Sequence, residues 1–364
     1  ISAPVTPVSG YPVTLTGETI HAPVAYNRDT ETELYVGTQS GKLYALNLDG
    51  TTRWSTAFDA TGGSTASIIS APRVVKEGSD TFIYFATNSG VWKVRDTGTS
   101  GSSIWKTSTG MVSVKGEPIV DPVNSNLYIG SQTMLYKINT STGSETLTIT
   151  VTGNLTGSVA VDDALGVNSC WIGSELGNVY GANTTNGGIS NTATLGTIKS
   201  SPFYDNVSGN IYFTSTDGKV YCRTAATLTA VPAGWTDYNT TNSIETTPFV
   251  NWAETPKALY FGANNGKMYK INAATGAWMW EYQTGTGSTA IKSMAVVYND
   301  VVYFGSDDGR CYALGTDGIP KSNWPVITGG AVKAAPVLGG WNGSAYTRIT
   351  FTSNDGKVYS LQIP

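Results

Sequence analysis

Charged residues are scarce in this chain, and the shortage limits what the protein can bind. Only 13% of its 364 residues are Asp, Glu, Lys or Arg, against about 25% in an ordinary globular domain. The formal net charge of −4 is small and has the wrong sign for attraction to nucleic-acid phosphates. A hydrophobic content of 40% still supports a large buried core. We therefore expect a globular protein that has no nucleic-acid partner.

Histidine and cysteine are also rare, which excludes several kinds of catalytic and metal centre. His21 is the only histidine, and the three cysteines are isolated from one another at Cys170, Cys222 and Cys311. Zinc sites of the Cys/His type, Ser-His-Asp triads and Cys-His dyads need histidines or paired cysteines at spacings that this chain lacks. We expect the three thiols to be buried and free.

Long apolar runs are missing as well. The sequence has no stretch of about 18 apolar residues, which a membrane-spanning helix requires. Residues 1–10 contain no basic and apolar export signal, and we expect that such a signal was removed ahead of residue 1. The low charge and many hydroxyl side chains favour an extracellular, cell-surface or periplasmic location.

What the chain does contain is a repeat that occurs eight times. It is first seen as Leu34–Gly37 followed by Gly41–Leu46, and it aligns two columns of aromatic residues. The first column consists of Tyr35, Tyr84, Tyr128, Trp171, Tyr212, Tyr260 and Tyr303, with Thr350 in the eighth place. The second consists of Tyr44, Trp92, Tyr136, Tyr180, Tyr221, Tyr269, Tyr312 and Tyr359. From Tyr44 to Tyr359 there are 315 residues in seven intervals, a mean period of 45 residues.

Each repeat has the pattern of four short antiparallel strands. Pairs such as Asn265-Gly266 and Asp308-Gly309 separate the two aromatic columns and predict two-residue hairpin turns. A further strand opens near a proline upstream of the hairpin, as at Pro23, and a fourth closes downstream on a tryptophan. These tryptophans are Trp54, Trp105, Trp235, Trp280 and Trp324. Four strands in about 45 residues match one propeller blade, so we predict an all-β, eight-bladed β-propeller.

The two ends of the sequence complete this prediction. The last repeat stops after its third strand, while Tyr11-Pro12-Val13 near the start resembles Trp324-Pro325-Val326 near the end. We therefore expect the N-terminal segment 5–16 to form the outer strand of the last blade, which closes the ring. On this interpretation residues 1–364 form a single propeller domain.

The repeat resembles the PQQ-like repeat of the quinoprotein dehydrogenase-like superfamily. The segment Lys270–Trp280 keeps Thr275, Gly276 and Trp280 of the tryptophan-docking pattern. In the dehydrogenase branch the resemblance implies a quinone with calcium or a lanthanide, a catalytic carboxylate and commonly a disulfide between neighbouring cysteines. This chain has no adjacent cysteine pair, and its inter-strand connections are short. It is therefore more similar to non-enzymatic members, such as the propeller lipoprotein of the outer-membrane barrel-assembly machinery and surface adhesin propellers.

One register of the repeat gives a candidate site. Three residues before the first-strand proline, or its equivalent, four repeats carry lysine and one carries glutamate; His21 falls one position later. Because this segment leads into the strand that lines a propeller channel, we predict an anion or partner site at the channel mouth. The candidate residues are Lys115, Lys199, Lys292, Lys333, Glu245 and His21. The alternative is that these side chains are solvated loop residues that point outward.

These observations favour a non-catalytic, secreted or cell-surface propeller that binds a protein partner, with no cofactor and no metal. A first alternative is a PQQ-dependent oxidoreductase that uses quinone and calcium. A second is a carbohydrate-binding adhesin, for which Trp252, Trp278 and Trp341 outside the aromatic columns would offer a glycan surface.

Overall fold

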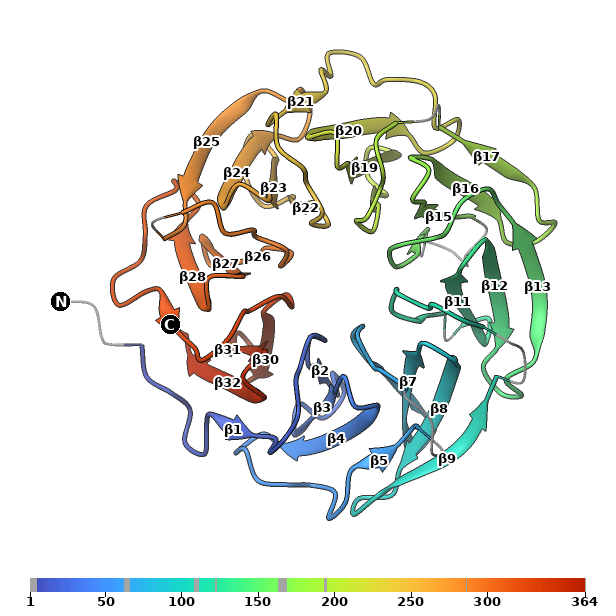
Figure 1. The fold of residues 1–364 in the computed structure, drawn as a ribbon, viewed down its shortest axis with the longest axis vertical. Helices are drawn as coiled ribbons and strands as arrows, with labels where there is room; N and C mark the ends of the chain where they lie inside the picture. The colour runs from blue at the N-terminus through green and yellow to red at the C-terminus, as the bar shows by residue number, and fades with distance from the viewer. Residues whose placement is uncertain are drawn as a thin grey trace. The chain divides into compact units, whose positions relative to one another are not determined.

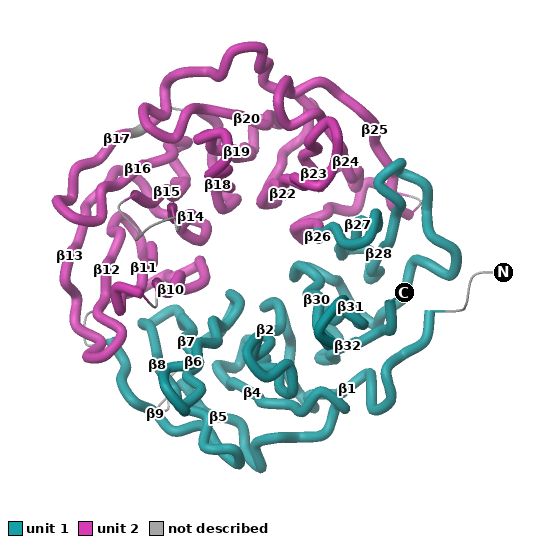
Figure 2. Tube along the Cα trace, turned by 180° about the vertical axis from the view of Figure 1, so that it is seen from behind, with its two compact units in different colours: residues 1–110, 296–364 teal, residues 111–295 magenta. Residues whose placement is uncertain are grey.

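The computed structural model describes residues 5–61, 66–107, 111–121, 123–162, 169–192, 195–285 and 287–363. All 32 regular elements in these ranges are strands, and they form eight four-stranded antiparallel sheets (Figure 1). The sheets belong to two compact units, with residues 1–110 and 296–364 in unit 1 and residues 111–295 in unit 2 (Figure 2). Each sheet is one blade, so the predicted all-β, eight-bladed β-propeller fold is confirmed.

Unit 1 holds blades 1, 2, 7 and 8. Blade 1 contains β2 (Ala25–Tyr26), β3 (Glu33–Gly37), β4 (Lys42–Asn47) and β5 (Phe58–Asp59). Blade 2 contains β6 (Arg73–Glu77), β7 (Asp80–Thr87), β8 (Gly90–Asp96) and β9 (Gly101–Lys106). Blade 7 contains β26 (Val296–Tyr298), β27 (Val301–Ser306), β28 (Arg310–Gly315) and β29 (Val326–Ile327). Blade 8 contains β30 (Val337–Trp341), β31 (Tyr346–Ser353), β32 (Lys357–Gln362) and β1 (Val13–Thr14).

Unit 2 holds blades 3 to 6. Blade 3 contains β10 (Ile119–Asp121), β11 (Asn126–Ser131), β12 (Met134–Asn139) and β13 (Glu145–Thr150). Blade 4 contains β14 (Ala160–Val161), β15 (Ser169–Gly173), β16 (Val179–Asn183) and β17 (Ile189–Asn191). Blade 5 contains β18 (Phe203–Asp205), β19 (Asn210–Thr214), β20 (Lys219–Thr224) and β21 (Tyr238–Asn239). Blade 6 contains β22 (Phe249–Asn251), β23 (Ala258–Gly262), β24 (Lys267–Asn272) and β25 (Trp278–Gln283).

The turn between the two aromatic columns of blade 6 differs from the two-residue hairpin that the sequence predicts, whereas Thr87 and Gly90 of blade 2 pair across a loop of two residues. In blade 6 the N–H of Ala263 donates to the carbonyl of Lys267, which leaves three residues in the loop. The N–H of Gly266 donates back to the carbonyl of Ala263, and Gly266 has a φ of +74°. This is a type I turn closed by a left-handed glycine, so only the second residue of the Asn-Gly pair needs a positive φ.

The N-terminal segment completes blade 8, as predicted. Val13 pairs with Val358 and Thr14 with Lys357, which makes β1 the outer strand beside β32. Further toward the N-terminus, the N–H of Val8 donates to the carbonyl of Ser360 at 2.9 Å. The single domain predicted for residues 1–364 stays a prediction.

The core of each unit lies between neighbouring blades. Leu43 of blade 1 and Ile83 of blade 2 share one buried cluster in unit 1. In unit 2, Val220 of blade 5 and Val250 of blade 6 share another. Alternate residues of each strand therefore bury apolar surface against the next sheet.

All three thiols are free and buried, as predicted: Cys170, Cys222 and Cys311.

The fourth strands depart partly from the prediction that they close on a tryptophan. Trp105 and Trp280 lie within β9 and β25, whereas Trp54, Trp235 and Trp324 precede the short strands β5, β21 and β29. Each of the five nevertheless packs against the first-column tyrosine of its own blade. The tryptophan thus fixes the outer segment of the blade even where only two residues pair as strand.

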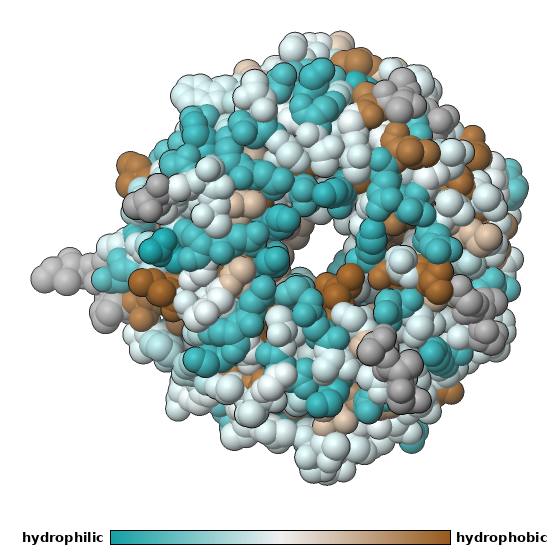
Figure 3. All heavy atoms as spheres, in the orientation of Figure 1, coloured by the Kyte–Doolittle hydropathy of each residue, from teal (hydrophilic) through white to brown (hydrophobic). Residues whose placement is uncertain are grey.

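The surface is mainly polar on the face that Figure 3 presents, where hydrophobic residues form small scattered patches. Among the described residues, no helix has the length and apolar character that crossing a membrane would take.

Candidate functional site

Four of the six predicted site residues line one cavity of about 240 Å³ in unit 2. These are Lys115, Lys199, Lys292 and Glu245, and the lining is completed by Thr156 and Glu175. Lys115 and Lys199 each lie four residues before the first strand of a blade, β10 and β18. The shared register in the repeat therefore does bring these side chains together.

The lysines of this cavity are held in ion pairs with two carboxylates. The Nζ atom of Lys115 lies 2.9 Å from Oε1 of Glu175, and that of Lys199 lies 3.1 Å from Oε1 of Glu245. Lys292 approaches the other oxygen of Glu245 at 3.4 Å. The lysine side chains remain 39–48% exposed, so each ammonium keeps N–H groups that face solvent. We call Lys115, Glu175, Lys199, Glu245 and Lys292 the lysine–glutamate cluster.

The cluster also sets the ionisation of its carboxylates. Burial would raise the pKa of Glu245, but hydrogen bonds from Lys199 and Asn264 and the charge of Lys292 lower it overall. Hydrogen bonds from Lys115 and Asn154 lower the pKa of Glu175. Both carboxylates are therefore ionised near neutral pH, and three ammonium groups against two carboxylates leave the cluster with one positive charge.

The remaining two predicted residues, His21 and Lys333, lie in unit 1. Nδ1 of His21 is 2.6 Å from Nε2 of Gln39. Burial and the charge of Lys333 lower the pKa of the imidazole, while Asp307 opposes that shift. The histidine is consequently neutral near pH 7 and adds no positive charge to its surroundings.

Glu175 is the cluster residue that the sequence did not reveal. It occupies the hairpin loop between β15 and β16, one blade after Lys115. Gln39 and Asn264 hold the same loop position in their blades and contact His21 and Glu245. Comparison of this loop position across the repeats with the register that holds the lysines would have indicated Glu175 as the ion-pair partner of Lys115.

The tryptophans outside the aromatic columns are partly exposed. Trp252 packs against Phe203 with ring centroids 5.4 Å apart and donates its N–H to Asp205, while Trp341 packs on Tyr346. Trp278 has more than half of its surface exposed. The adhesin alternative that rests on these residues stays a prediction.

Among the residues that the structure describes, a quinone-type cofactor with calcium would need several ligands grouped around the metal ion. Within those ranges, no group of three or more His, Cys, Asp or Glu side chains is placed to hold a metal ion. Burial raises the pKa of Cys170 and of Cys222 to about 12, which keeps these thiols protonated and unreactive. The alternative of a PQQ-dependent oxidoreductase stays a prediction.

Several solved structures share the fold over nearly the whole chain. BamB from Moraxella catarrhalis is 17% identical, with a TM-score of 0.70 over 99% of this chain and 98% of that chain. Sqt1 from Saccharomyces cerevisiae is 13% identical, with a TM-score of 0.78 over 100% of both chains. The computationally designed Ika8 protein is 14% identical, with a TM-score of 0.72 over 96% of this chain and 99% of that chain.

The family comparison is more specific than these structural matches. No match was found among curated protein sequences. A family model described as outer membrane protein assembly factor BamB matches residues 12–145 and 93–317, which together span more than half of the chain. The chain therefore belongs to this family of PQQ-like repeat proteins, the outer membrane protein assembly factor BamB family.

Proposed function

We propose that the protein is a non-catalytic scaffold that binds an acidic segment of a protein partner through the lysine–glutamate cluster, in an extracellular, cell-surface or periplasmic setting. The observation that carries this proposal is the presence of three part-exposed ammonium groups at one cavity of unit 2. The family description, an outer membrane protein assembly factor, supports both the scaffold role and the exported setting.

The charges of the cluster explain why the partner would be acidic. Glu175 and Glu245 already accept hydrogen bonds from the lysines and hold them in place. An incoming carboxylate can accept from the N–H groups that still face solvent, and it meets a site with one surplus positive charge. Because the lysines are already restrained by their ion pairs, binding costs less side-chain entropy than the ordering of free lysines would.

The test is chemical cross-linking on intact cells that produce the protein, followed by identification of the cross-linked partner. The cluster variant carries Lys115→Gln, Lys199→Gln and Lys292→Gln. The control variant removes the same number of charges from exposed lysines elsewhere, through Lys76→Gln, Lys106→Gln and Lys321→Gln. We expect to recover one specific partner with the wild type and with the control variant. With the cluster variant, the amount of cross-linked partner should fall about tenfold.

Two results would contradict the proposal. Equal recovery of the partner with the cluster variant and the control variant would show that the lysines do not carry the interaction. Dye-linked alcohol oxidation by the purified protein with PQQ and calcium would show that it is an enzyme.

A further inference from the structure

Five blades place a tryptophan against the first-column tyrosine with nearly the same geometry. The ring centroids are 5.6–5.9 Å apart and the ring planes meet at 58–68° in all five. The pairs are Tyr35 with Trp54, Tyr84 with Trp105, Tyr212 with Trp235, Tyr260 with Trp280, and Tyr303 with Trp324. The fold thus contains a recurrent place for an indole ring.

Blade 4 has this place but lacks the tryptophan. In blade 6, Trp280 pairs across the strands with Lys270; in blade 4 the residues in the same register are Ser190 and Gly181. The first-column residue is Trp171, whose N–H donates to the carbonyl of Ala225 in blade 5 at 3.2 Å. Relative to blade 6, a hydroxymethyl group therefore replaces the indole of Trp280, and a hydrogen atom replaces the side chain of Lys270.

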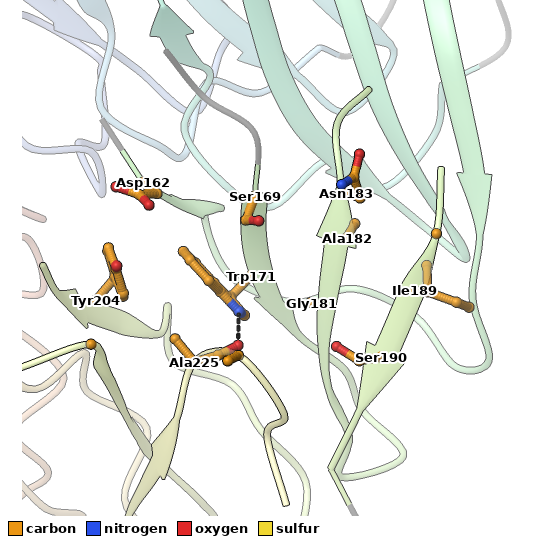
Figure 4. A pocket seen from close by; sticks show the side chains of 13 residues that line it. Asp162, Ser169, Trp171, Gly181, Ala182, Asn183, Ile189, Ser190, Tyr204 and Ala225 are labelled. Carbon is orange, nitrogen blue, oxygen red and sulfur yellow. Dashed lines mark hydrogen bonds between the residues drawn. The ribbon is translucent and has the colours of Figure 1, made fainter. Parts of the chain in front are cut away.

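The missing side chains leave a pocket of about 510 Å³ within unit 2 (Figure 4). This is well within the range of about 300 to 1,000 Å³ that is usual for small-ligand sites. Trp171 and Tyr204 lie side by side on one side of the pocket, with ring centroids 4.5 Å apart. Ile189 and Ser190 of β17 line the other side.

Blade 3 shows that the loss of this tryptophan need not open a pocket. Leu147 stands opposite Lys137, in the position of the tryptophan, and it fills most of the space. The cavity that remains beside Tyr128 and Leu147 measures about 10 Å³, roughly the space of a single water probe. The pocket of blade 4 is therefore a specific feature of Gly181 and Ser190 and does not follow from every missing tryptophan.

We propose that this pocket, which we call the blade 4 pocket, binds the tryptophan side chain of an extended segment from a partner protein. The inference does not depend on the lysine–glutamate cluster and adds a second binding site to unit 2. An indole is the occupant that the fold itself accommodates at the corresponding place in five other blades.

The polar lining also matches an indole. Trp54 donates its N–H to Asp96 at 2.9 Å, and Trp235 donates its N–H to Asp237 at 2.8 Å. The blade 4 pocket likewise has a carboxylate in its wall, that of Asp162, beside the aromatic pair. A carboxylate has acceptor sites for several donors, so Asp162 can accept the indole N–H.

The position of the pocket explains why the segment would be extended. β17 is the last strand in the sheet order of blade 4, and within the described residues no strand pairs with its outer edge. A peptide that pairs with this edge can direct every second side chain toward the pocket. Main-chain hydrogen bonds would then add affinity to the docked ring.

The experiment uses the intact chain and a fluorinated N-acetyltryptophanamide that is followed by fluorine NMR. We expect saturable binding with a dissociation constant on the order of 1 mM. Unlabelled N-acetyltryptophanamide should displace the probe, whereas N-acetylleucinamide and methyl glucoside should not. A blocked pentapeptide with a central tryptophan should displace it at lower concentration than the amide does, and the alanine version of the peptide should fail.

Two variants connect the binding to the blade 4 pocket. Ser190→Trp supplies the missing side chain and should weaken binding more than tenfold, while Leu147→Trp makes the same change in blade 3 and should leave binding intact. Tyr204→Ala removes one aromatic wall and should weaken binding by about 2- to 10-fold. This half-buried position also keeps the proposal testable if Ser190→Trp does not fold.

Three results would overturn the proposal. The first is the absence of saturable binding by the wild type. The second is unchanged binding by Ser190→Trp, or by Tyr204→Ala where the former does not fold. The third is displacement of the probe by methyl glucoside as effectively as by N-acetyltryptophanamide, which would identify a saccharide site.

Discussion

Asp96 connects blades 1 and 2, and its replacement gives the sharpest test of how neighbouring blades hold together. Its Oδ2 accepts from the hydroxyl of Tyr35 at 2.6 Å and from Nε of Arg53 at 2.7 Å. Its Oδ1 accepts from the indole of Trp54 at 2.9 Å and from the N–H of Gly98 at 2.7 Å. The carboxylate is 1% exposed, so water cannot replace these donors.

The variant Asp96→Asn keeps the shape of the side chain but turns one acceptor oxygen into a donor. Whichever oxygen is replaced, two of the four donors then face an NH₂ group. Each buried donor that loses its acceptor costs about 1–3 kcal/mol, so we expect the free energy of unfolding to fall by about 2–6 kcal/mol. Loss of the buried ion pair with Arg53 acts in the same direction.

The assay is equilibrium urea unfolding followed by tryptophan fluorescence. Asp80→Asn serves as the control because Asp80 forms an exposed ion pair with Arg95 at 3.5 Å, which is worth less than about 1 kcal/mol. Tyr35→Phe removes one donor, and the double variant with Asp96→Asn should lose less than the sum of the two single losses. If Asp96→Asn and Asp80→Asn unfold at the same urea concentration, the reasoning about buried donors is refuted.

Three further predictions concern backbone, acid and thiols. Gly276→Ala should destabilise the protein more than Gly209→Ala, although both glycines have a positive φ. An added Cβ at Gly276 would lie 2.1 Å from the carbonyl oxygen of Thr236, whereas at Gly209 it would meet no atom within 4 Å beyond its chain neighbours. The urea midpoints of the two variants test this prediction, and equal midpoints would contradict it. Burial would raise the pKa of the Asp96 carboxyl, but hydrogen bonds from Tyr35, Trp54 and Gly98 lower it overall. The stability that ionised Asp96 contributes is therefore complete above the unfolded-state pKa of about 3.9 and is lost as the pH falls through the lower pKa of the folded state. The urea midpoint should therefore drop as the pH falls below about 4, and it should drop less in Asp96→Asn. Burial raises the pKa of the thiols of Cys170, Cys222 and Cys311. Mass spectrometry should therefore show that a thiol reagent at pH 8 labels none of the three within minutes in the folded protein and all of them in urea. Rapid labelling of the folded protein would contradict this prediction.

Much of the fold could be predicted from the sequence because each blade is specified by contacts within about 45 residues. The Asn-Gly and Asp-Gly turns, the aromatic columns and the tryptophans all act inside one repeat. Even the long-range pairing of β1 with β32 left a signal, since Tyr11-Pro12-Val13 repeats the pattern of Trp324-Pro325-Val326. The predicted loop of blade 6 was one residue too short, because an Asn-Gly pair is compatible with both loop lengths.

The sites were less predictable because they depend on contacts between blades and on what is missing. The ion pair of Lys115 with Glu175 joins residues 60 positions apart in two blades, and no pattern within one repeat contains it. The blade 4 pocket arises from Gly181 and Ser190, two small residues that carry no recognisable motif. Only alignment of blade 4 with blade 6 through their strand registers shows that they stand in the places of Lys270 and Trp280.

The pairing of Val13 with Val358 has a consequence for the order of events during synthesis. At about 5–20 residues per second, the 345 residues that separate the two partners take roughly 20–70 s to be made. For that time the first strand has no partner, while each of blades 1 to 7 can pair its strands soon after they emerge. β32 therefore pairs with β1 long after β1 was made, and a ribosome that stalls before β32 would leave nearly complete blades and an unpaired β1.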